Sequence, residues 1–318
     1  MTEIQAESEL FHSNLGAYRA HEAVFESLTP VARYVYRVGS DVPGGWSDPY
    51  EITVTDPERE TIRIAVVGDT RTRMDVWRRV IRATADEEPD FIVHTGDIIS
   101  NGRDQDDWNR WFNEAADVLP FTPFMPIMGN HERYAKNYFV SYSLPANGPG
   151  GVHAGEAYSF DYGPTHWVGL HTCANMDIQT PWLEEHLAGV DKPWIFAFYH
   201  RPAYSAHPSR GDGNMDVREA WSPIFSEHNV AIAWQGHDHY YSRSKPINNG
   251  EIVSADRGVV YIVSGGGGAP LYDFAPNQWI AAGRKTEQYV LIEITGNTLH
   301  GKAITPDGEV FDEFTMTR

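Results

Sequence analysis

The sequence lacks several features that would point to particular classes of protein. It has one cysteine, Cys173, so no disulfide can form within the chain, and we expect this thiol to be a buried small apolar side chain. It has no apolar run of roughly 18 residues, which excludes an ordinary membrane-spanning helix. The first residues, MTEIQAESELF, lack the basic and apolar segments of a signal peptide. We therefore expect a cytoplasmic protein, or one trimmed of an export signal.

Basic residues are also scarce. The chain has 25 Lys and Arg against 44 Asp and Glu, which gives a formal charge of −19. Such a surface repels nucleic acids and anionic membranes, and the sequence has neither a basic stretch nor an aromatic–basic alternation. We expect neither as a partner. A small anionic substrate would need a local positive field at its site, which bound metal ions would supply.

Apolar residues are plentiful by contrast. The chain has 318 residues, of which 41% are hydrophobic and ten are Trp, and this composition is typical of a packed globular protein. The length suits one large domain with a small one beside it. From about Thr61 onward, strand-like and helix-like segments alternate. Helices are expected at 74–88, 104–119, 180–190 and 215–228, with aspartates capping the second.

Five short apolar runs each end in a residue that can bind a metal. Each run has the length and the β-branched or aromatic content of a buried strand. Ligands bind at the carboxyl ends of strands in open α/β sheets, so we expect these five ends to meet. The runs are IAVVGD (Asp69), FIVHTGD (Asp97), PFMPIMGNH (Asn130, His131), WIFAFYH (His200) and VAIAWQGHDH (His237, His239).

These side chains offer oxygen and nitrogen donors suited to Zn²⁺, Mn²⁺ or iron, in a number sufficient for two ions. Asp97 is the predicted bridging ligand, because each of its two oxygens can hold one cation. We expect the remaining ligands to divide between a first ion, held by Asp69 and His239, and a second, held by Asn130, His200 and His237. His237 and His239 are two residues apart, so in extended chain they point the same way.

The same residues show a family resemblance. Five motifs stand in the order found in the calcineurin-like metallophosphoesterases and are similar to theirs: GDT at 68–70, GDII at 96–99, GNHE at 129–132, FYHRP at 198–202 and GHDH at 236–239. The sequence around them most resembles the purple acid phosphatase branch. The resemblance extends from about Ser27 to the C-terminus and implies the ligand roles given above. It also implies an α+β fold, namely a four-layer α/β/β/α metallophosphoesterase sandwich with a small N-terminal β module.

The N-terminal segment is expected to form a partial module. We predict that residues 1–57 are a fibronectin-like β module of the kind that precedes the catalytic domain in purple acid phosphatases, and that 58–318 form the catalytic domain. The spacing of Leu28, Pro30 and Tyr34 resembles a tyrosine corner. Only three or four strands fit, including HEAVFESL, ARYVYRVG and DPYEITVT. A sheet that small should lie against the catalytic domain or against another subunit, which would make a homo-oligomer.

Two positions depart from the family pattern. Arg71 stands where many metallophosphoesterases have a metal-binding His, and Ser100 stands where purple acid phosphatases have the iron-binding Tyr. The first ion therefore lacks a recognisable fourth protein ligand, and water, Ser100 or Asn101 would fill its place. We expect two divalent or trivalent ions of Fe, Mn or Zn without a tyrosinate–iron bond, and hence a protein that is not purple.

The resulting prediction is a dinuclear phosphoesterase that hydrolyses phosphomonoesters through a metal-bridging hydroxide. His131 is the first candidate to protonate the leaving oxygen, and His207 is the second. Substrate phosphate would be bound by one or more of the arginines beside the ligand motifs, Arg71, Arg133 and Arg201. Two alternatives stay open: a phosphodiesterase acting at the same site, and a non-catalytic metal-binding interaction scaffold.

Overall fold

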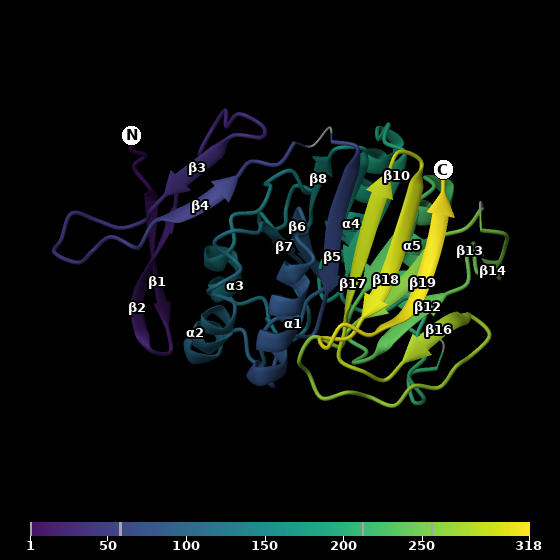
Figure 1. Ribbon diagram of the computed structural model, residues 1–318. Helices are drawn as coiled ribbons and strands as arrows, with labels where there is room; N and C mark the ends of the chain where they lie inside the picture. Colours follow the sequence, from purple (N-terminus) through teal and green to yellow (C-terminus); the bar gives the residue numbers. More distant parts are fainter. Residues whose placement is uncertain (1, 57–58, 212, 256) are drawn as a thin grey trace.

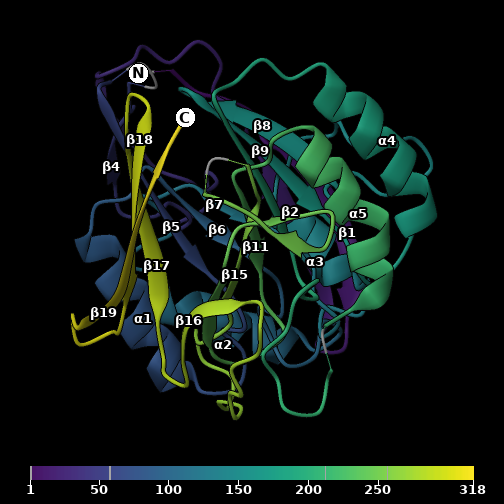
Figure 2. The same cartoon turned by 90° about the vertical axis from the view of Figure 1, so that its right-hand side faces the viewer.

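The computed structural model describes residues 2–56, 59–211, 213–255 and 257–318. Two mixed β-sheets pack face to face, and helices cover their outer faces (Figures 1 and 2). These are the four layers predicted from the sequence. The predicted division of the chain between residues 57 and 58 lies outside the described residues and stays a prediction.

One sheet has six strands in the order β19-β18-β17-β5-β6-β7. The neighbours β5, β6 and β7 are parallel, and the other pairs are antiparallel. Helices α1 (Met74–Asp86), α2 (Gln105–Glu114) and α3 (Lys136–Ser141) lie on its outer side. The strands are β5 Thr61–Val67, β6 Phe91–His94, β7 Phe124–Pro126, β17 Tyr289–Thr295, β18 Thr298–Ile304 and β19 Val310–Thr317.

The other sheet has seven strands in the order β16-β12-β15-β11-β10-β9-β8. Its four central strands, β15, β11, β10 and β9, run parallel. Helices α4 (Met176–Ala188) and α5 (Met215–Glu227) cover its outer face (Figure 2). The strands are β8 Tyr158–Tyr162, β9 Thr165–Leu170, β10 Trp194–Tyr199, β11 Ile232–Gln235, β12 Tyr241–Ser244, β15 Val260–Ser264 and β16 Ile280–Arg284, and a small separate hairpin pairs β13 Ile247–Asn248 with β14 Glu251–Ile252.

Strand β10 shows why the apolar runs are continuous rather than alternating. All six of its residues are buried. Trp194, Phe196 and Phe198 point into the core between the two sheets, whereas Ile195 and Tyr199 point into the core beneath α4 and α5. A strand that is covered on both faces needs apolar side chains at every position.

The structure corrects several element boundaries. The second predicted helix, at 104–119, is capped by the Asp104 side chain as expected but ends at Glu114. The segment 133–156 contains only the short helix α3 among the helices of the described residues. HEAVFESL at 21–28 was predicted to be a strand, but β2 (Gly16–Glu22) ends near its start. The strand stops there because its partner β1 (Glu7–Ser13) begins at Glu7, opposite Glu22.

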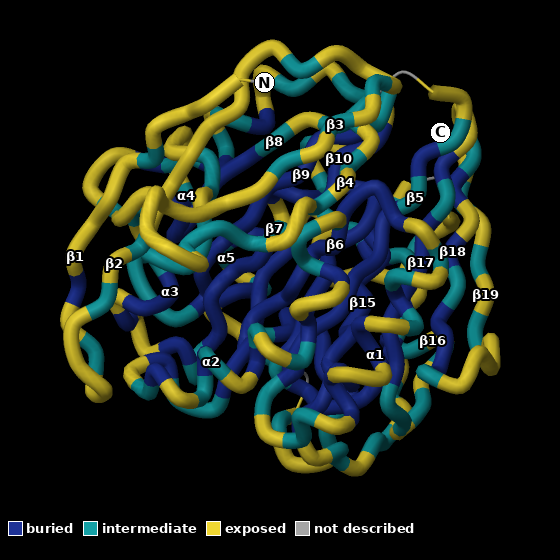
Figure 3. Tube along the Cα trace, turned by 60° about the vertical axis from the view of Figure 1, so that its left-hand side comes forward, coloured by how far each residue is buried: buried dark blue, intermediate teal, exposed yellow. Residues whose placement is uncertain are grey.

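The N-terminal segment forms two hairpins, β1–β2 and β3–β4, instead of one small sheet. The second hairpin pairs β3 (Arg33–Tyr36) with β4 (Tyr50–Thr53). Ahead of it, the backbone N–H of Thr29 donates a 3.0 Å hydrogen bond to the hydroxyl of Tyr34, which is the contact that defines a tyrosine corner. The hairpins are largely exposed, unlike the buried sheets (Figure 3).

The hairpins lie against the part of the chain that carries α2 and α3 (Figure 1). The side chain of Asn14 donates to Asp104 over 2.9 Å and accepts from the N–H of Gln105 over 2.8 Å. The Tyr36 hydroxyl donates a 2.7 Å bond to the carbonyl of Pro120. The two N-terminal hairpins therefore pack on the region around α2 and α3, mostly through polar contacts.

None of the helices in the described ranges has the length and apolar character needed to cross a lipid bilayer.

Cys173 follows β9 and is mostly shielded from solvent. Burial raises the pKa of its thiol from 9.0 to about 11. At pH 8, which lies below both values, the higher pKa leaves about 100-fold less thiolate, the form that reacts. We expect iodoacetamide to alkylate the folded protein about 100 times more slowly than the urea-unfolded protein. Mass spectrometry over time would measure this, and equal rates would contradict it.

Candidate metal centre

Six side chains at the carboxyl ends of five strands lie together between the two sheets. Asp69 follows β5 and Asp97 follows β6. The His237 backbone N–H donates a 2.8 Å hydrogen bond to Asp69 Oδ2, which links the two sheets at this edge. The other members are Asn130 after β7, His200 after β10, and His239 two residues beyond His237.

The donor atoms form two groups that share one carboxylate. Asp97, His200 and His237 make one group, and Asp69, Asp97 and His239 make the other; within each, one ligand atom from every residue lies within 4.8 Å of the rest. The Asn130 Oδ1 atom lies 3.2 Å from His200 Nε2 and so joins the first group. The structure thus places Asp97 between the two sets of donors.

Hydrogen bonds orient the imidazoles toward this centre. His200 Nδ1 lies 3.0 Å from the carbonyl of Thr95, and His239 Nδ1 lies 2.7 Å from the carbonyl of Pro270. A carbonyl can only accept, so both Nδ1 atoms carry a proton, and in the neutral rings both Nε2 atoms keep a lone pair for the centre. A ligand histidine is commonly fixed in this way by a partner of its other nitrogen.

Burial makes the centre suited to cations. Asp69 and Asp97 are almost fully buried, and Asp69 Oδ1 has no hydrogen-bond partner among the described residues. Burial opposes charge on His200, but the adjacent Asp97 outweighs it and raises the pKa of His200 to about 9. Buried carboxylates without enough partners are costly unless a cation is present, so the residues fit a metal pair.

The backbone at the centre takes conformations that are uncommon for residues with side chains. Asp69, Asp97 and His237 have φ values of 56°, 57° and 68°. Such strained residues gather at functional sites, where the surrounding structure holds them. Gly129 is needed for space, because a Cβ atom there would lie 2.3 Å from Asp97 Oδ1. The GNH motif therefore combines a ligand with a glycine that lets Asp97 approach.

Glu132 is a functional residue that the sequence reasoning missed. It is fully buried, and its carboxylate accepts backbone hydrogen bonds from Asp97 (3.1 Å), Ile98 (2.7 Å) and Gly129 (2.6 Å). It thereby fixes the turn that presents Asp97. Burial and the charge of Asp97 together raise the pKa of Glu132 to about 7. An acidic residue directly after two site residues, in GNHE, was the available signal.

Asp238 was also missed, although it stands between two proposed ligands in GHDH. It is fully buried and forms an ion pair with Arg210. Its Oδ2 accepts hydrogen bonds from the hydroxyls of Ser205 and Tyr240, the latter over 2.6 Å. Asp238 therefore anchors the segment 205–210 beside the centre and does not face the ligands.

The predicted substrate arginines differ in position. Arg71 reaches the centre: its Nε lies 3.5 Å from Asp97 Oδ2, and its Nη2 lies 3.3 Å from His239 Nε2. Arg201 follows His200, and its buried Nε has no hydrogen-bond partner among the described residues. Arg133 is exposed. Ser100 was one of the groups predicted to complete the coordination of the first ion, and its Oγ lies 3.3 Å from Thr72 Oγ1.

The two predicted acid histidines also differ. His131 Nδ1 lies 2.7 Å from the carbonyl of Ser100, and its Nε2 lies 3.8 Å from Asp97 Oδ2. His207 is separated from His239 by an aromatic ring: it meets Tyr272 edge-on at 5.2 Å, and Tyr272 stacks on His239 at 3.9 Å. Of the two, His131 is the histidine with a ring nitrogen near Asp97.

A family model described as calcineurin-like phosphoesterase matches residues 62–241, more than half of the chain. The chain belongs to the calcineurin-like phosphoesterase family. All six clustered side chains fall within the matched span. The family membership predicted from the five motifs is confirmed.

Relatives place the chain in the purple acid phosphatase branch of this family. Mouse acid phosphatase type 7 is 28% identical over 344 residues, covering 94% of this chain and 77% of the mouse protein. A probable inactive purple acid phosphatase 1 of Arabidopsis thaliana is 25% identical, over 94% of this chain and 57% of its own length. The solved structure of purple acid phosphatase PPD1 from yellow lupin seeds has the same fold, with a TM-score of 0.84, 20% identity, and coverage of 99% of this chain and 70% of the lupin chain. The chain is a metal-dependent phosphoesterase.

Arg71 offers a direct test of the first-ion site. We expect Arg71→His to tighten metal binding there by about 10-fold or more, because it removes a competing positive charge and adds an imidazole donor. Removing a residue that only hydrogen-bonds a metal ligand already changes metal affinity by about 10- to 100-fold, and a direct ligand should matter at least as much. Metal content after dialysis against graded free Mn²⁺ would measure it. Arg71→Gln is the matched control, since it removes the charge without adding an imidazole. Equal affinity of the two variants would contradict the expectation.

Proposed function

We propose that this chain hydrolyses phosphomonoesters at a dinuclear metal centre. Asp97 would bridge the two ions, with Asp69 and His239 on one and Asn130, His200 and His237 on the other. The observation that supports this most is the pair of donor groups that share Asp97 and no other residue. When bound, two ions activate water as a nucleophile and neutralise charge on the phosphoryl group.

His131 is proposed to protonate the leaving oxygen. Its Nδ1–H donates to the Ser100 carbonyl over 2.7 Å, which fixes the ring and leaves Nε2 as the atom that can exchange a proton. That Nε2 is on the Asp97 side of the ring, 3.8 Å from Oδ2, and the side chain remains partly open to solvent. A general acid must reach both the reacting group and a source of protons, and this position allows both.

Arg71 and Arg201 are proposed to bind the phosphoryl oxygens. Each has a buried Nε that lacks a hydrogen-bond partner among the described residues, so each guanidinium has an unused donor. Guanidinium groups bind phosphate through paired N–H donors. Both lie next to the centre, and Arg201 contributes to lowering the pKa of His237, after burial, His200 and Arg210. They supply local positive charge in a chain whose net charge is −19.

A non-catalytic scaffold is the alternative from a different class. The Arabidopsis relative described as probably inactive supports considering it. Against it, all six proposed ligands are present here, and backbone carbonyls bound to the Nδ1 atoms of His200 and His239 orient these two rings toward the shared carboxylate. The phosphodiesterase alternative uses the same ligands and differs only in the substrate.

One assay separates the three. The purified protein would be stripped of metal, reconstituted separately with Mn²⁺, Zn²⁺ and Fe²⁺, and analysed for metal content. Each form would then be assayed with p-nitrophenyl phosphate and bis-p-nitrophenyl phosphate. We expect two ions per chain at the centre and faster cleavage of the monoester. Faster cleavage of the diester would replace the proposal with a phosphodiesterase, and metal uptake without any turnover would replace it with the scaffold.

A further inference from the structure

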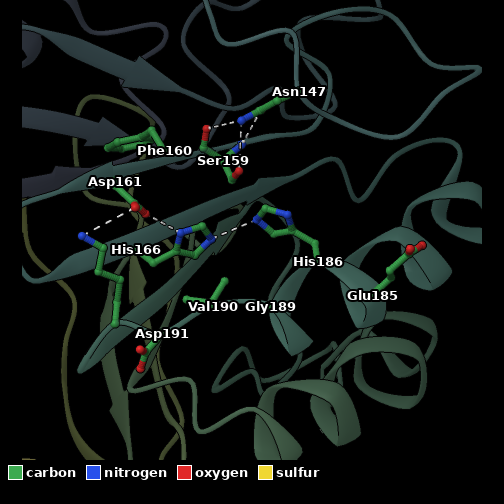
Figure 4. Close-up of a pocket in the computed structure, with 11 residues that line it drawn as sticks. Asn147, Ser159, Phe160, Asp161, His166, Glu185, His186, Gly189, Val190 and Asp191 are labelled. Atoms are coloured by element: carbon green, nitrogen blue, oxygen red, sulfur yellow. Dashed lines mark hydrogen bonds and ion pairs between the residues drawn. The ribbon is translucent and has the colours of Figure 1, made fainter.

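A second cluster of imidazoles lies away from the metal centre, where the edge strand β8 and its neighbour β9 lie beside helix α4 (Figure 4). His166 is on β9, and His186 is on α4; their Nε2 atoms lie 3.0 Å apart. Asp161, on β8, lies with Oδ1 2.7 Å from His166 Nδ1. The three side chains line an open cavity of about 780 Å³.

This cluster is separate from the phosphatase centre. His166 pairs with Ile195, at the start of β10, whereas His200 follows the last residue of that strand. The two histidines are therefore about five residues apart along parallel strands, or about 16 Å. His166 also faces α4, on the outer side of the sheet, because its neighbour Trp167 points into the core between the sheets.

The hydrogen bonds leave one position between the two rings. A carboxylate can only accept, so His166 Nδ1 holds a proton for Asp161 and the neutral ring has a lone pair on Nε2. His186 Nε2 faces that lone pair at 3.0 Å. Burial lowers the pKa of both imidazoles, which favours their neutral, metal-binding forms. The space between the two Nε2 atoms can therefore hold either one proton, shared in a hydrogen bond, or one metal cation.

We propose that His166 and His186 bind a divalent transition-metal ion through their Nε2 atoms, with solvent in the cavity completing the coordination. With metal–nitrogen bonds of about 2.0 Å, neighbouring ligands are about 2.8 Å apart in square-planar or octahedral geometry and about 3.3 Å apart in tetrahedral geometry. The observed 3.0 Å lies between these values. Imidazole pairs suit Ni²⁺, Cu²⁺ and Zn²⁺.

Three features hold the pair ready for a cation. Asp161 behind His166 forms the carboxylate–histidine arrangement that orients metal ligands and raises their basicity. Lys192 Nζ lies 3.6 Å from Asp161 Oδ2 and donates to the carbonyl of Gly163, which holds the carboxylate in place. The ring of Trp182 stacks on His186 at 4.9 Å and 14°. A bound ion would tie the β8–β9 edge to α4 and stabilise the fold by mass action.

Ni²⁺ uptake by the whole protein tests the proposal. Equilibrium dialysis at graded free Ni²⁺, followed by elemental analysis, would compare the wild type with His186→Ala. Because the proposed phosphatase centre would also take up Ni²⁺, the readout is the difference between the two proteins. We expect His186→Ala to bind one ion fewer per chain while p-nitrophenyl phosphate turnover stays unchanged. The control is His300→Ala, an exposed histidine on β18, which should bind as many ions as the wild type.

Asp161→Asn provides a second test that keeps both ligands. We expect it to raise the Kd of that same ion about 10 to 100-fold, since the orienting carboxylate is lost. Far-UV circular dichroism would check that each variant is folded. Identical Ni²⁺ binding curves for the wild type and a folded His186→Ala would overturn the proposal and leave a plain histidine–histidine hydrogen bond. If His186→Ala did not fold, Asp161→Asn would decide, and an unchanged Kd in that variant would overturn the proposal.

Discussion

Replacing Asp97 by Asn is expected to reduce phosphatase turnover by about 10³-fold or more. A carboxylate can hold two cations with two oxygens, whereas an amide offers one neutral oxygen. Loss of the two metal ions would remove several kcal/mol of transition-state charge stabilisation, and about 4 kcal/mol corresponds to a factor of about 10³ in rate. Steady-state kinetics with p-nitrophenyl phosphate, together with elemental analysis, would measure both losses.

The substitution should leave the fold intact. Asn has the shape of Asp, and its Oδ1 can still accept the 2.9 Å hydrogen bond from the His131 N–H. Asp307→Asn is a suitable control, because that carboxylate is 80% exposed and forms a surface ion pair with Arg79. The control should keep wild-type turnover and metal content. If Asp97→Asn kept two ions and the wild-type rate, the bridging role of Asp97 would have to be abandoned.

The position of the centre was predictable because each predicted ligand followed a recognisable buried strand. WIFAFYH and VAIAWQGHDH have the continuous apolar content of strands covered on both faces, and such strands direct their carboxyl ends to one edge. Local sequence was enough there. The bridging role of Asp97 was predicted from its two carboxylate oxygens and from the family resemblance, and the structure places it after the strand next to the one that precedes Asp69.

Other features depended on contacts between distant segments and were not predictable. HEAVFESL has strand-like composition, yet only its first two residues belong to β2, because pairing ends where β1 begins. Glu132 and Asp238 act through hydrogen bonds whose partners come from turns and loops that only the folded chain brings close. The reach of Arg71 into the centre likewise depends on the turn after β5, where Asp69 has a positive φ.

His131→Ala is expected to lower turnover of an alkyl phosphate by about 10²- to 10⁴-fold, since an alkoxide leaves poorly without a proton. An activated aryl phosphate, whose leaving group needs little protonation, should lose much less. His207→Ala is the matched comparison: it removes an imidazole that is separated from His239 by the ring of Tyr272, so we expect a smaller effect on turnover.

The dependence on the leaving group distinguishes acid catalysis from a positioning role. If His131 only held Asp97 through its backbone N–H, alanine would preserve that 2.9 Å bond and all substrates would be affected alike. If its Nε2 delivers the proton, the ratio of aryl to alkyl turnover must rise in His131→Ala and stay at the wild-type value in His207→Ala. A rise in His207→Ala instead would transfer the acid role to that histidine, because the proton would then have to come from the Tyr272 side of the centre.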